Sequence, residues 1–331
     1  MLSRDPSRRR RLALAAVALS VGVAACGDDE EGSGGGRIKP NPDNKGIEVT
    51  VGSRSGTEQK ILAEIYSQAL EAAGYRVVTD SDLGSEPEAR QALESGEISG
   101  YPAYLTELPS ASPGESASDQ DQATAAAQAA LRQEGLLGFE PAPYSRTSAV
   151  GLLVSTAEKL NVEKISDLRG KAGGVRISGT PACESSPTCL AGIEGAYGLS
   201  FSEFVPADAS VRYGVLDDDA ADLSILETSD APLFATPLHY TVLDDDKGVF
   251  PAGNPMFVSS PTEVKGAGSD FRATIERVQR GLDLDQVQEL NALVDVTGER
   301  PGPVAREYLQ EFGYIPGSPA APAGGELLQR R

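Results

Sequence analysis

Most of the chain divides into segments in which hydrophobic and polar positions recur with the period of a strand or of a helix. Each segment has the length of a single strand or helix. Residues 47–51 alternate apolar and polar side chains as a half-buried strand does. Apolar residues then recur at helical spacing over residues 61–70, which predicts a helix with one apolar face that ends at Gly74. Ser55 and Glu58 have the spacing of a capping box at the start of this helix.

The rest of the chain changes repeatedly from strand-like to helix-like periodicity. Further strands are predicted at residues 75–79, 98–105, 136–139, 149–154, 174–177, 221–226, 240–243 and 257–259. Further helices are predicted at residues 87–95, 119–133, 165–168, 190–197, 269–280, 285–294 and 303–312. Strands that alternate with helices indicate an α/β fold, here with a helix-rich C-terminal part.

Residues 1–25 have the features of a secretory signal. A basic start that includes residues 8–11 is followed by the mostly apolar residues 12–25, which end in small side chains before Cys26. These fourteen residues are too few to span a bilayer, which needs about 20. A cysteine in this position is the pattern of a bacterial lipoprotein with a diacylated Cys26, and an ordinary signal with an incidental cysteine is the alternative. Two acyl chains anchor a protein stably, so we expect a body tethered at the extracytoplasmic face of the cell membrane.

The net charge of the chain limits the classes of molecule that it can bind. The formal net charge is −20, and the predicted signal carries five arginines and one aspartate, so its removal leaves −24. Such an acidic surface repels nucleic acid and anionic lipid headgroups, and we expect no nucleic-acid partner. The chain has one histidine and no Cys-x-x-Cys pair, which argues against a zinc site and a Ser-His-Asp hydrolase. We expect neither a metal nor a cofactor.

Two further cysteines, Cys183 and Cys189, have five residues between them. Outside the cytoplasm such a pair more often oxidises than stays reduced, so we expect a local disulfide that pins a loop. A catalytic redox pair is the alternative, although such pairs usually lie closer together at the start of a helix.

Five stretches between residues 47 and 315 carry a recognisable pattern. The first two read VGSRSGTEQ at residues 51–59 and LESGEISGYPAY at residues 93–104. The other three are residues 181–199 with both cysteines, VLDDDKGVFP at residues 242–251, and QELNALVDV at residues 288–296. In this order and spacing, the five stretches resemble the substrate-binding proteins of glycine betaine/choline (osmoprotectant) ABC importers.

The resemblance implies a fold and a division of the chain. The expected architecture is α/β and two-lobed, the periplasmic-binding-protein-like type II or Venus-flytrap fold, with two crossover hinge strands. Residues 47–147 and 255–315 would form lobe 1, and residues 148–254 lobe 2. Residues 26–46 are charged and glycine-rich, as in a flexible tether, and residues 316–331 are predicted to be a disordered tail. A monomer of this kind would bind a small molecule between its lobes and pass it to a membrane permease.

The chemistry of that family depends on aromatic rings. A quaternary ammonium group has no N–H to donate, so the family surrounds it with a box of rings. By the resemblance, Tyr104 falls on a box tyrosine, Gln59 on a glutamine, and Arg54 where a lysine is frequent. Arg54 also lies in a loop before a helix N-terminus, which suits an anionic group. The alternatives are a core role for Tyr104 and surface roles for Arg54 and Gln59.

Other box positions depart from the family pattern. Ser148 stands where the family usually has an aromatic ring, and Arg146 where it usually has an acid. Glu227 stands where the family often has an aromatic residue, directly before the motif that here is residues 228–230 and ends at Asp230. Gly253 replaces a further ring, and a family threonine becomes Glu107. Loss of three rings would weaken betaine binding by roughly 3–6 kcal/mol, unless other tyrosines substitute for them. The candidate substitutes are Tyr101, Tyr144, Tyr213 and Tyr240.

These departures give two ligand hypotheses. The first is a quaternary ammonium compound, as in the family. The second is an amine or amino acid with N–H groups, held by Glu107 and Glu227 at its cation and by Arg146 or Arg54 at its carboxylate; the alternative for both glutamates is exposure to solvent. The candidate ligand-binding residues are Arg54, Gln59, Tyr104, Glu107, Arg146, Ser148, Glu227, Asp230 and Asn254.

Two other classes of protein remain as alternatives. An enzyme is possible on the same scaffold because a fold does not fix a function, but the sequence contains no metal cluster, nucleophile–base pair or Gly-x-Gly-x-x-Gly motif. The acidic runs at residues 217–219 and 244–246 lack the loop spacing of a calcium site. A structural lipoprotein is the second alternative, and a ligand-induced gain in stability would exclude it.

Overall fold

The computed structural model describes residues 37–108, 119–234 and 237–317. The predicted signal peptide, the lipidation candidate Cys26 and most of the predicted tail lie outside these residues. Within them, no helix has the length and the apolar character needed to cross a bilayer.

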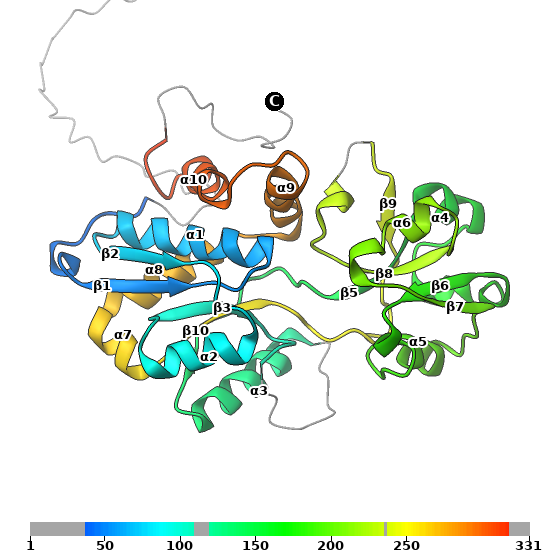
Figure 1. Cartoon of the computed structure of the whole chain (residues 1–331), viewed down its shortest axis with the longest axis horizontal. Coiled ribbons are helices and arrows are strands. Elements are labelled where there is room, and N and C mark those ends of the chain that lie inside the picture. The colour runs from blue at the N-terminus through cyan, green and yellow to red at the C-terminus, as the bar shows by residue number, and fades with distance from the viewer. Residues whose placement is uncertain (1–36, 109–118, 235–236, 318–331) are drawn as a thin grey trace, which may run out of the picture. The chain divides into compact units, whose positions relative to one another are not determined.

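The described chain contains two five-stranded sheets (Figure 1). The first consists of β1 (Glu48–Gly52), β2 (Arg76–Asp80), β3 (Gly100–Tyr104), β4 (Leu137–Gly138) and β10 (Pro255–Ser259), in the order β2-β1-β3-β10-β4. β1 is parallel to β2 and β3, whereas β10 is antiparallel to β3 and β4. Because β10 comes from late in the sequence, this sheet joins two distant parts of the chain.

Helices cover both faces of the first sheet. They are α1 (Thr57–Ala72), α2 (Glu86–Ser95), α3 (Gln120–Gln133), α7 (Pro261–Ala267), α8 (Ser269–Gln279), α9 (Leu284–Asp295) and α10 (Pro301–Glu311). Buried side chains of α1, α8, α9 and α10 share one core, and those of α2 and α3 form a second core. The helices α2 and α3 lie on the opposite face of the sheet from α1 (Figure 1). We call this sheet with its helices the first lobe.

Strand β10 contributes to both cores of the first lobe, as the alternation of a strand requires. Phe257 packs in one core, with ring centroids 5.4 Å from Tyr66 and 5.3 Å from Phe139. Its neighbours Met256 and Val258 are buried in the other core. A strand buried on both faces reads as a continuous apolar run, which explains why it was predicted as a strand.

The second sheet has the order β7-β6-β8-β5-β9 and, with its helices, forms the second lobe. Its strands are β5 (Ser148–Leu153), β6 (Arg176–Gly179), β7 (Glu203–Pro206), β8 (Leu223–Glu227) and β9 (Tyr240–Val242). Its helices are α4 (Val154–Leu160), α5 (Leu190–Tyr197) and α6 (Gly214–Asp217), with 3-10 turns at Ile165–Leu168, Ala172–Gly174, Pro181–Cys183, Ala209–Val211 and Ala231–Phe234. The two sheets confirm the predicted two-lobed α/β fold class.

Two extended segments, residues 139–147 and 251–254, connect the lobes and lie side by side. The Ala142 amide donates to the Pro255 carbonyl at 2.8 Å, and the Gly253 amide donates to Ser145 Oγ at 2.8 Å. Thr147 Oγ1 donates to the Pro251 carbonyl at 2.7 Å. The segments are bonded to each other but belong to neither sheet.

The tether predicted for residues 26–46 is wrong over residues 37–46. Ile38 is buried in the first-lobe core, and its amide donates to the Tyr314 carbonyl at 2.8 Å. A 3-10 turn, Pro42–Asn44, follows, and the Asn44 side chain donates to the Ala73 carbonyl at 2.9 Å. Polar composition predicted a tether, whereas long-range hydrogen bonds hold this segment against the lobe.

The prediction of a capping box at Ser55 and Glu58 is also wrong. Helix α1 has Gly56 at its N-cap and no side-chain cap. Four short elements, β7, α4, α6 and α7, were not predicted. Each has seven residues or fewer, too few for a periodicity to be distinct from its surroundings.

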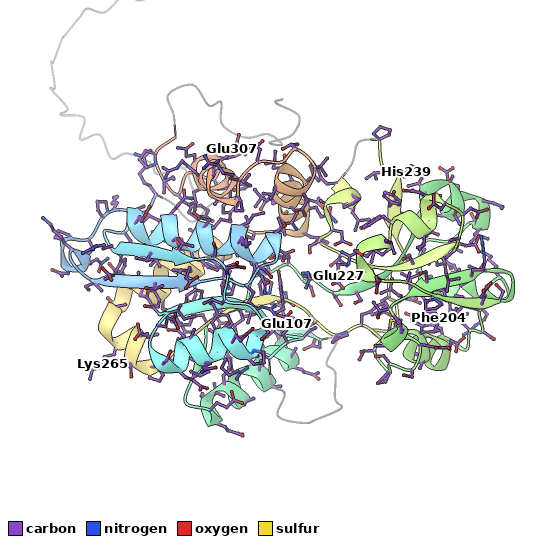
Figure 2. The ribbon with its side chains drawn as sticks, viewed as in Figure 1. Glu107, Phe204, Glu227, His239, Lys265 and Glu307 are labelled. Atoms are coloured by element: carbon purple, nitrogen blue, oxygen red, sulfur yellow. A yellow bond between two sulfur atoms is a disulfide. The ribbon has the colours of Figure 1, made fainter. Side chains whose placement is uncertain are left out.

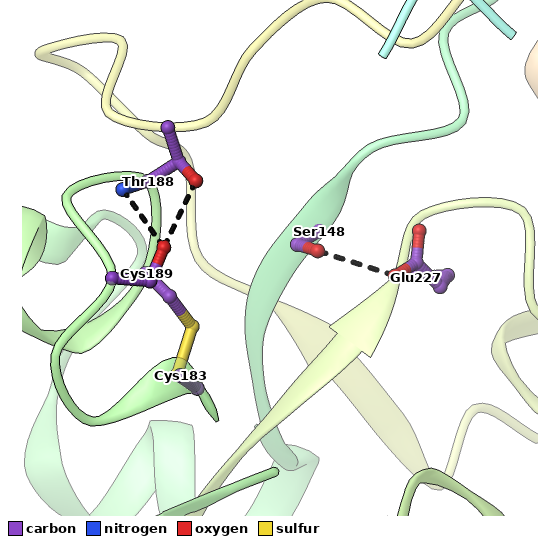
Figure 3. Close-up of a disulfide and its surroundings, with 6 residues drawn as sticks. Ser148, Cys183, Thr188, Cys189 and Glu227 are labelled. Atoms are coloured by element: carbon purple, nitrogen blue, oxygen red, sulfur yellow. Dashed lines mark hydrogen bonds between the residues drawn. A yellow bond between two sulfur atoms is a disulfide. The ribbon is translucent and has the colours of Figure 1, made fainter. Parts of the chain in front are cut away.

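The sulfur atoms of Cys183 and Cys189 lie 2.01 Å apart, at the distance of a disulfide (Figure 3). The pair joins a 3-10 turn after β6 to the residue that precedes α5. Both cysteines belong to the buried core of the second lobe. The loop predicted to be pinned is therefore closed at its two ends.

Replacing both cysteines by serine is expected to lower the free energy of unfolding by about 2 kcal/mol, because the unfolded chain regains the freedom of a short closed loop. Urea denaturation of the wild type and of Cys183→Ser/Cys189→Ser measures the difference. Wild-type protein unfolded in the presence of a reductant is the control, and it should match the variant. Equal stability of the variant and the oxidised wild type would contradict the prediction.

Candidate ligand-binding site

The first lobe brings three of the candidate residues together at the ends of its strands. Arg54 follows β1, and Gln59 lies in the first turn of α1. Glu107 lies just after β3 (Figure 2). The Arg54 guanidinium forms an ion pair with the Glu107 carboxylate. With its amide oxygen turned toward Arg54, Gln59 accepts a hydrogen bond from Arg54 Nε at 2.9 Å. Glu107 is therefore already balanced by a cation of the chain itself.

Tyr104 ends β3 and is almost completely buried, with 2% of its surface exposed. Its hydroxyl donates to Glu58 Oε1 at 2.7 Å. The guanidinium carbon of Arg146 lies 4.8 Å from the centroid of its ring. Burial and the nearby charge of Glu58 raise the pKa of Tyr104 well above its ordinary value. A ring face that would suit a ligand cation is thus covered by an arginine of this chain.

The charge of Arg146 also acts on the carboxylate of Glu227, which ends β8. Ser148 and Glu227 are register partners on β5 and β8, and Ser148 Oγ donates to Glu227 Oε1 at 3.2 Å (Figure 3). Burial raises the pKa of Glu227 and Asp230 adds to the effect, while the charge of Arg146 opposes it. For Arg146, burial alone would lower the pKa, but the negative groups around it outweigh burial and raise the pKa.

The carboxylate of Asp230 is occupied by groups of its own lobe. It pairs with Arg212. It also accepts from the Tyr213 hydroxyl at 2.9 Å and from the Glu227 amide at 3.0 Å. Sequence reasoning missed Arg212, because a single arginine outside any motif gives no signal of its partner.

Asn254 ends one of the two connecting segments and is 1% exposed. Its amide group donates to the carbonyls of Ala142 and Tyr144, at 3.0 and 2.8 Å. Both contacts are with backbone, so the amide nitrogen fastens one connecting segment to the other.

The four tyrosines considered as substitute rings lie in three different places. Tyr101 is buried between β3 and α2, where its hydroxyl donates to Glu86 at 3.1 Å. Tyr144 is buried in the first lobe. Tyr213 and Tyr240 form an edge-to-face pair in the second lobe with centroids 4.7 Å apart. Tyr144 lies near Tyr104, because both hydroxyls donate to Glu58 Oε1, but within the described residues the four rings do not form a box around it.

Gly253, which stands at one of the lost ring positions, has no room for a side chain. A Cβ atom there would lie 1.7 Å from the carbonyl oxygen of Arg146. Because that contact is with backbone, it cannot be relieved by a side-chain rotation. The close approach of the two connecting segments therefore excludes an aromatic residue at this position.

Glu58 is the main residue that sequence reasoning missed. It is 8% exposed and accepts hydrogen bonds from Tyr104, Tyr144, Ser229 and Asn291. A signal was present in the sequence, because Glu58 precedes Ile61, Leu62 and Ile65 by three, four and seven residues and so lies on the buried face of α1. An acidic residue on an apolar helix face needs partners inside the fold.

The raised pKa of Glu227 predicts a pH-dependent cost to folding. Well below the ordinary glutamate pKa of 4.5, the carboxyl is protonated in the folded and the unfolded chain, and there is no cost. As pH rises through 4.5, the unfolded chain loses the proton first, so stability falls until the folded group also ionises. Glu227→Gln is expected to be more stable than the wild type at about pH 7, and this advantage should disappear by about pH 4.

Urea denaturation at the two pH values measures this effect. Glu203→Gln removes an exposed glutamate from β7 of the same lobe and is the matched control, with no change expected at either pH. An advantage of Glu227→Gln that is the same at both pH values would contradict the assignment to ionisation.

Comparison of the sequence with known proteins identifies a family that the chain matches. Residues 47–311 match the family model OpuAC, described as the substrate binding domain of ABC-type glycine betaine transport systems. A glycine-betaine-binding protein of Pseudomonas aeruginosa is 28% identical over 84% of this chain and 92% of its own length. The glycine betaine-binding protein YehZ of Escherichia coli is 25% identical over 80% of this chain and 91% of its own length.

Solved structures show the same fold. A glycine betaine/carnitine/choline ABC transporter structure superimposes with a TM-score of 0.72 at 22% identity, over 80% of this chain and 99% of that chain. Apo YehZ from Escherichia coli gives 0.68 at 24% identity, over 80% and 99% of the two chains. The matched family consists of binding proteins and not of enzymes. The chain belongs to the family of substrate-binding domains of ABC-type glycine betaine transport systems.

Proposed function

We propose that this protein is a lipid-anchored, extracytoplasmic binding protein that captures a small solute between its lobes and delivers it to an ABC permease. The basic and apolar residues before Cys26 support export and diacylation. Ligand contacts from both lobes would favour one arrangement of the lobes, which the permease then engages. The acidic surface keeps such a tethered monomer soluble.

For the ligand, we propose a zwitterion whose cation carries N–H groups, such as an amino acid. The observation that carries this proposal is the position of Arg146 over the ring of Tyr104, from where its charge also acts on the carboxylate of Glu227. A zwitterion gives the positive charge of Arg146 and the negative charge of Glu227 each a partner of opposite sign. Its carboxylate matches the guanidinium fork, and its N–H groups donate to Glu227. A quaternary ammonium group has no N–H to donate to Glu227.

Glycine betaine or choline is the second candidate. Relatives described as glycine betaine-binding and carnitine transport binding proteins support it, and Tyr104 retains a ring at a box position. For such a ligand, Arg146 would have to leave the ring face that the cation needs.

A thermal-shift screen followed by calorimetry separates the two candidates. The panel contains glycine betaine, choline, carnitine, proline betaine, ordinary amino acids and polyamines, and a ligand at 100 times its Kd adds about 2.7 kcal/mol of stability. Stabilisation by amino acids but not by betaine is the expected result. Micromolar betaine binding that Tyr104→Ala abolishes would overturn the proposed ligand and restore the family's own.

A further inference from the structure

The carboxylate of Glu58 collects donors from distant parts of the chain. Oε1 accepts from the hydroxyls of Tyr104 and Tyr144, at 2.7 and 2.8 Å. Oε2 accepts from Ser229 Oγ at 2.5 Å and from Asn291 Nδ2 at 3.2 Å. These partners lie at the end of β3, in a connecting segment, just after β8 and on α9. One oxygen therefore holds two rings, and the other holds a residue of the second lobe.

No salt bridge to Glu58 is present among the described residues, although the group is buried. An ionised carboxylate in such a place is stable only if hydrogen bonds replace its hydration. Four donors on two oxygens meet that requirement. The same arrangement makes the donors depend on the carboxylate, because each of them is itself buried and would be left without this acceptor.

The segment that contains Ser229 is held on both sides. From the first lobe, Gln288 Nε2 donates to the Thr228 carbonyl at 2.7 Å, and Asn291 Nδ2 donates to the Ser229 carbonyl at 2.8 Å. From a connecting segment, the Thr147 carbonyl accepts from the Thr228 amide at 2.9 Å. Ser229 immediately precedes Asp230, the partner of Arg212, and follows Glu227 by two residues, so its position fixes the second-lobe side of the site.

We propose that Glu58 is a positioning residue for ligand capture. Its single carboxylate fixes the positions of the rings of Tyr104 and Tyr144 and the position of the second-lobe segment of residues 228–230. This inference rests on the proposed binding function and deepens it. Tyr104 carries the Arg146 guanidinium over its ring, and Glu58 acts on the ligand through Tyr104 and Ser229. The hydrogen bond that the neutral phenol donates to this carboxylate polarises its O–H bond and so strengthens the negative face of the ring, which favours a cation above it.

The first test is a double-mutant cycle of ligand affinity in the full chain. Tyr104→Phe keeps the ring and removes only its bond to Glu58, and Glu58→Gln removes the charge with little change in shape. Each single variant is expected to bind the ligand identified by the panel about tenfold more weakly, and the double variant no more weakly than either single one. Wild-type affinity in Tyr104→Phe, or losses that add in the double variant, would overturn the proposal.

The second test needs no ligand. Hydrogen exchange of the ligand-free full chain reports on the amides of Asp230 and Leu233, which are bonded within the segment after β8. Exchange of these amides is expected to be about tenfold faster in Glu58→Gln and in Ser229→Ala, because the segment loses its fixed contact with α1. Glu64→Gln changes another glutamate of the same helix, one that accepts from Gln68 Nε2 at 3.1 Å, and it should exchange as the wild type does.

The two tests separate this inference from the proposed function. If no compound of the panel binds the wild type, the proposed function fails, while faster exchange in Glu58→Gln still supports the positioning role. Unchanged exchange in both Glu58→Gln and Ser229→Ala overturns the positioning role, whatever the ligand is. Ser229→Ala keeps the test valid if Glu58→Gln does not fold.

Discussion

Replacing Arg146 by alanine is expected to reverse the ligand preference of this protein. Binding of a carboxylate-bearing amino acid should fall about a hundredfold, because loss of one partner of a desolvated charge pair typically costs 2–5 kcal/mol. Binding of a quaternary ammonium should improve, because the ring of Tyr104, now 4.8 Å from the guanidinium carbon, becomes available to the ligand cation. Isothermal titration with one ligand of each class measures both changes.

A matched variant controls for the loss of a positive charge. Arg76→Ala removes an arginine of β2 whose side chain is 76% exposed and paired with Glu48. Its affinities are expected to stay within about twofold of the wild type, since exposed ion pairs contribute little. Weaker binding of both ligand classes by Arg146→Ala would contradict the prediction, because it would mean that Arg146 supports the site without selecting the ligand.

Gly253→Ala is expected to lower the free energy of unfolding by about 3 kcal/mol, at the upper end of the cost of overpacking. The new methyl group would lie 1.7 Å from the Arg146 carbonyl oxygen, so the two connecting segments would have to separate. That movement breaks the hydrogen bond between the Gly253 amide and Ser145 Oγ. Chemical denaturation gives the stability difference.

Gly195→Ala is the control for the same chemical change. Gly195 lies inside α5, and a Cβ atom there would meet nothing within 4 Å. In a helix, alanine is favoured over glycine by about 1 kcal/mol, so this variant should be more stable than the wild type. A Gly253→Ala protein as stable as the wild type would show that the connecting segments adapt at little cost.

Most of the fold could be predicted from the sequence because its long elements have a clear period. The helices α1, α3, α8, α9 and α10 and the strands of both sheets alternate in an order that indicates an α/β fold, and the five recognisable stretches indicate two lobes. The failures have physical causes. Ile38 is apolar but stands within polar neighbours, so only its contact with the last helices shows that it is buried.

The candidate site could be predicted only in part. The sequence identified Arg54, Tyr104, Arg146 and Glu227, whose types depart from or follow a family pattern. It could not indicate that Arg54 pairs with Glu107, since a pairing depends on where two strands end. The partners of Glu58 lie from 46 to 233 positions away along the chain, and no local pattern carries such contacts.

The strand order in the two sheets determines which lobe can complete its fold first during synthesis. All five strands of the second sheet lie between residues 148 and 242, and its core ends at Phe250, so this lobe can complete its core once residue 250 has been synthesised. The first sheet lacks β10 until residue 259 exists, and its core also requires Tyr308 and Tyr314 near the C-terminal end. The lobe that starts first therefore finishes last. Until then its N-terminal strands and α1 present an incomplete apolar surface, and a chaperone that covers such surfaces would have most to bind there.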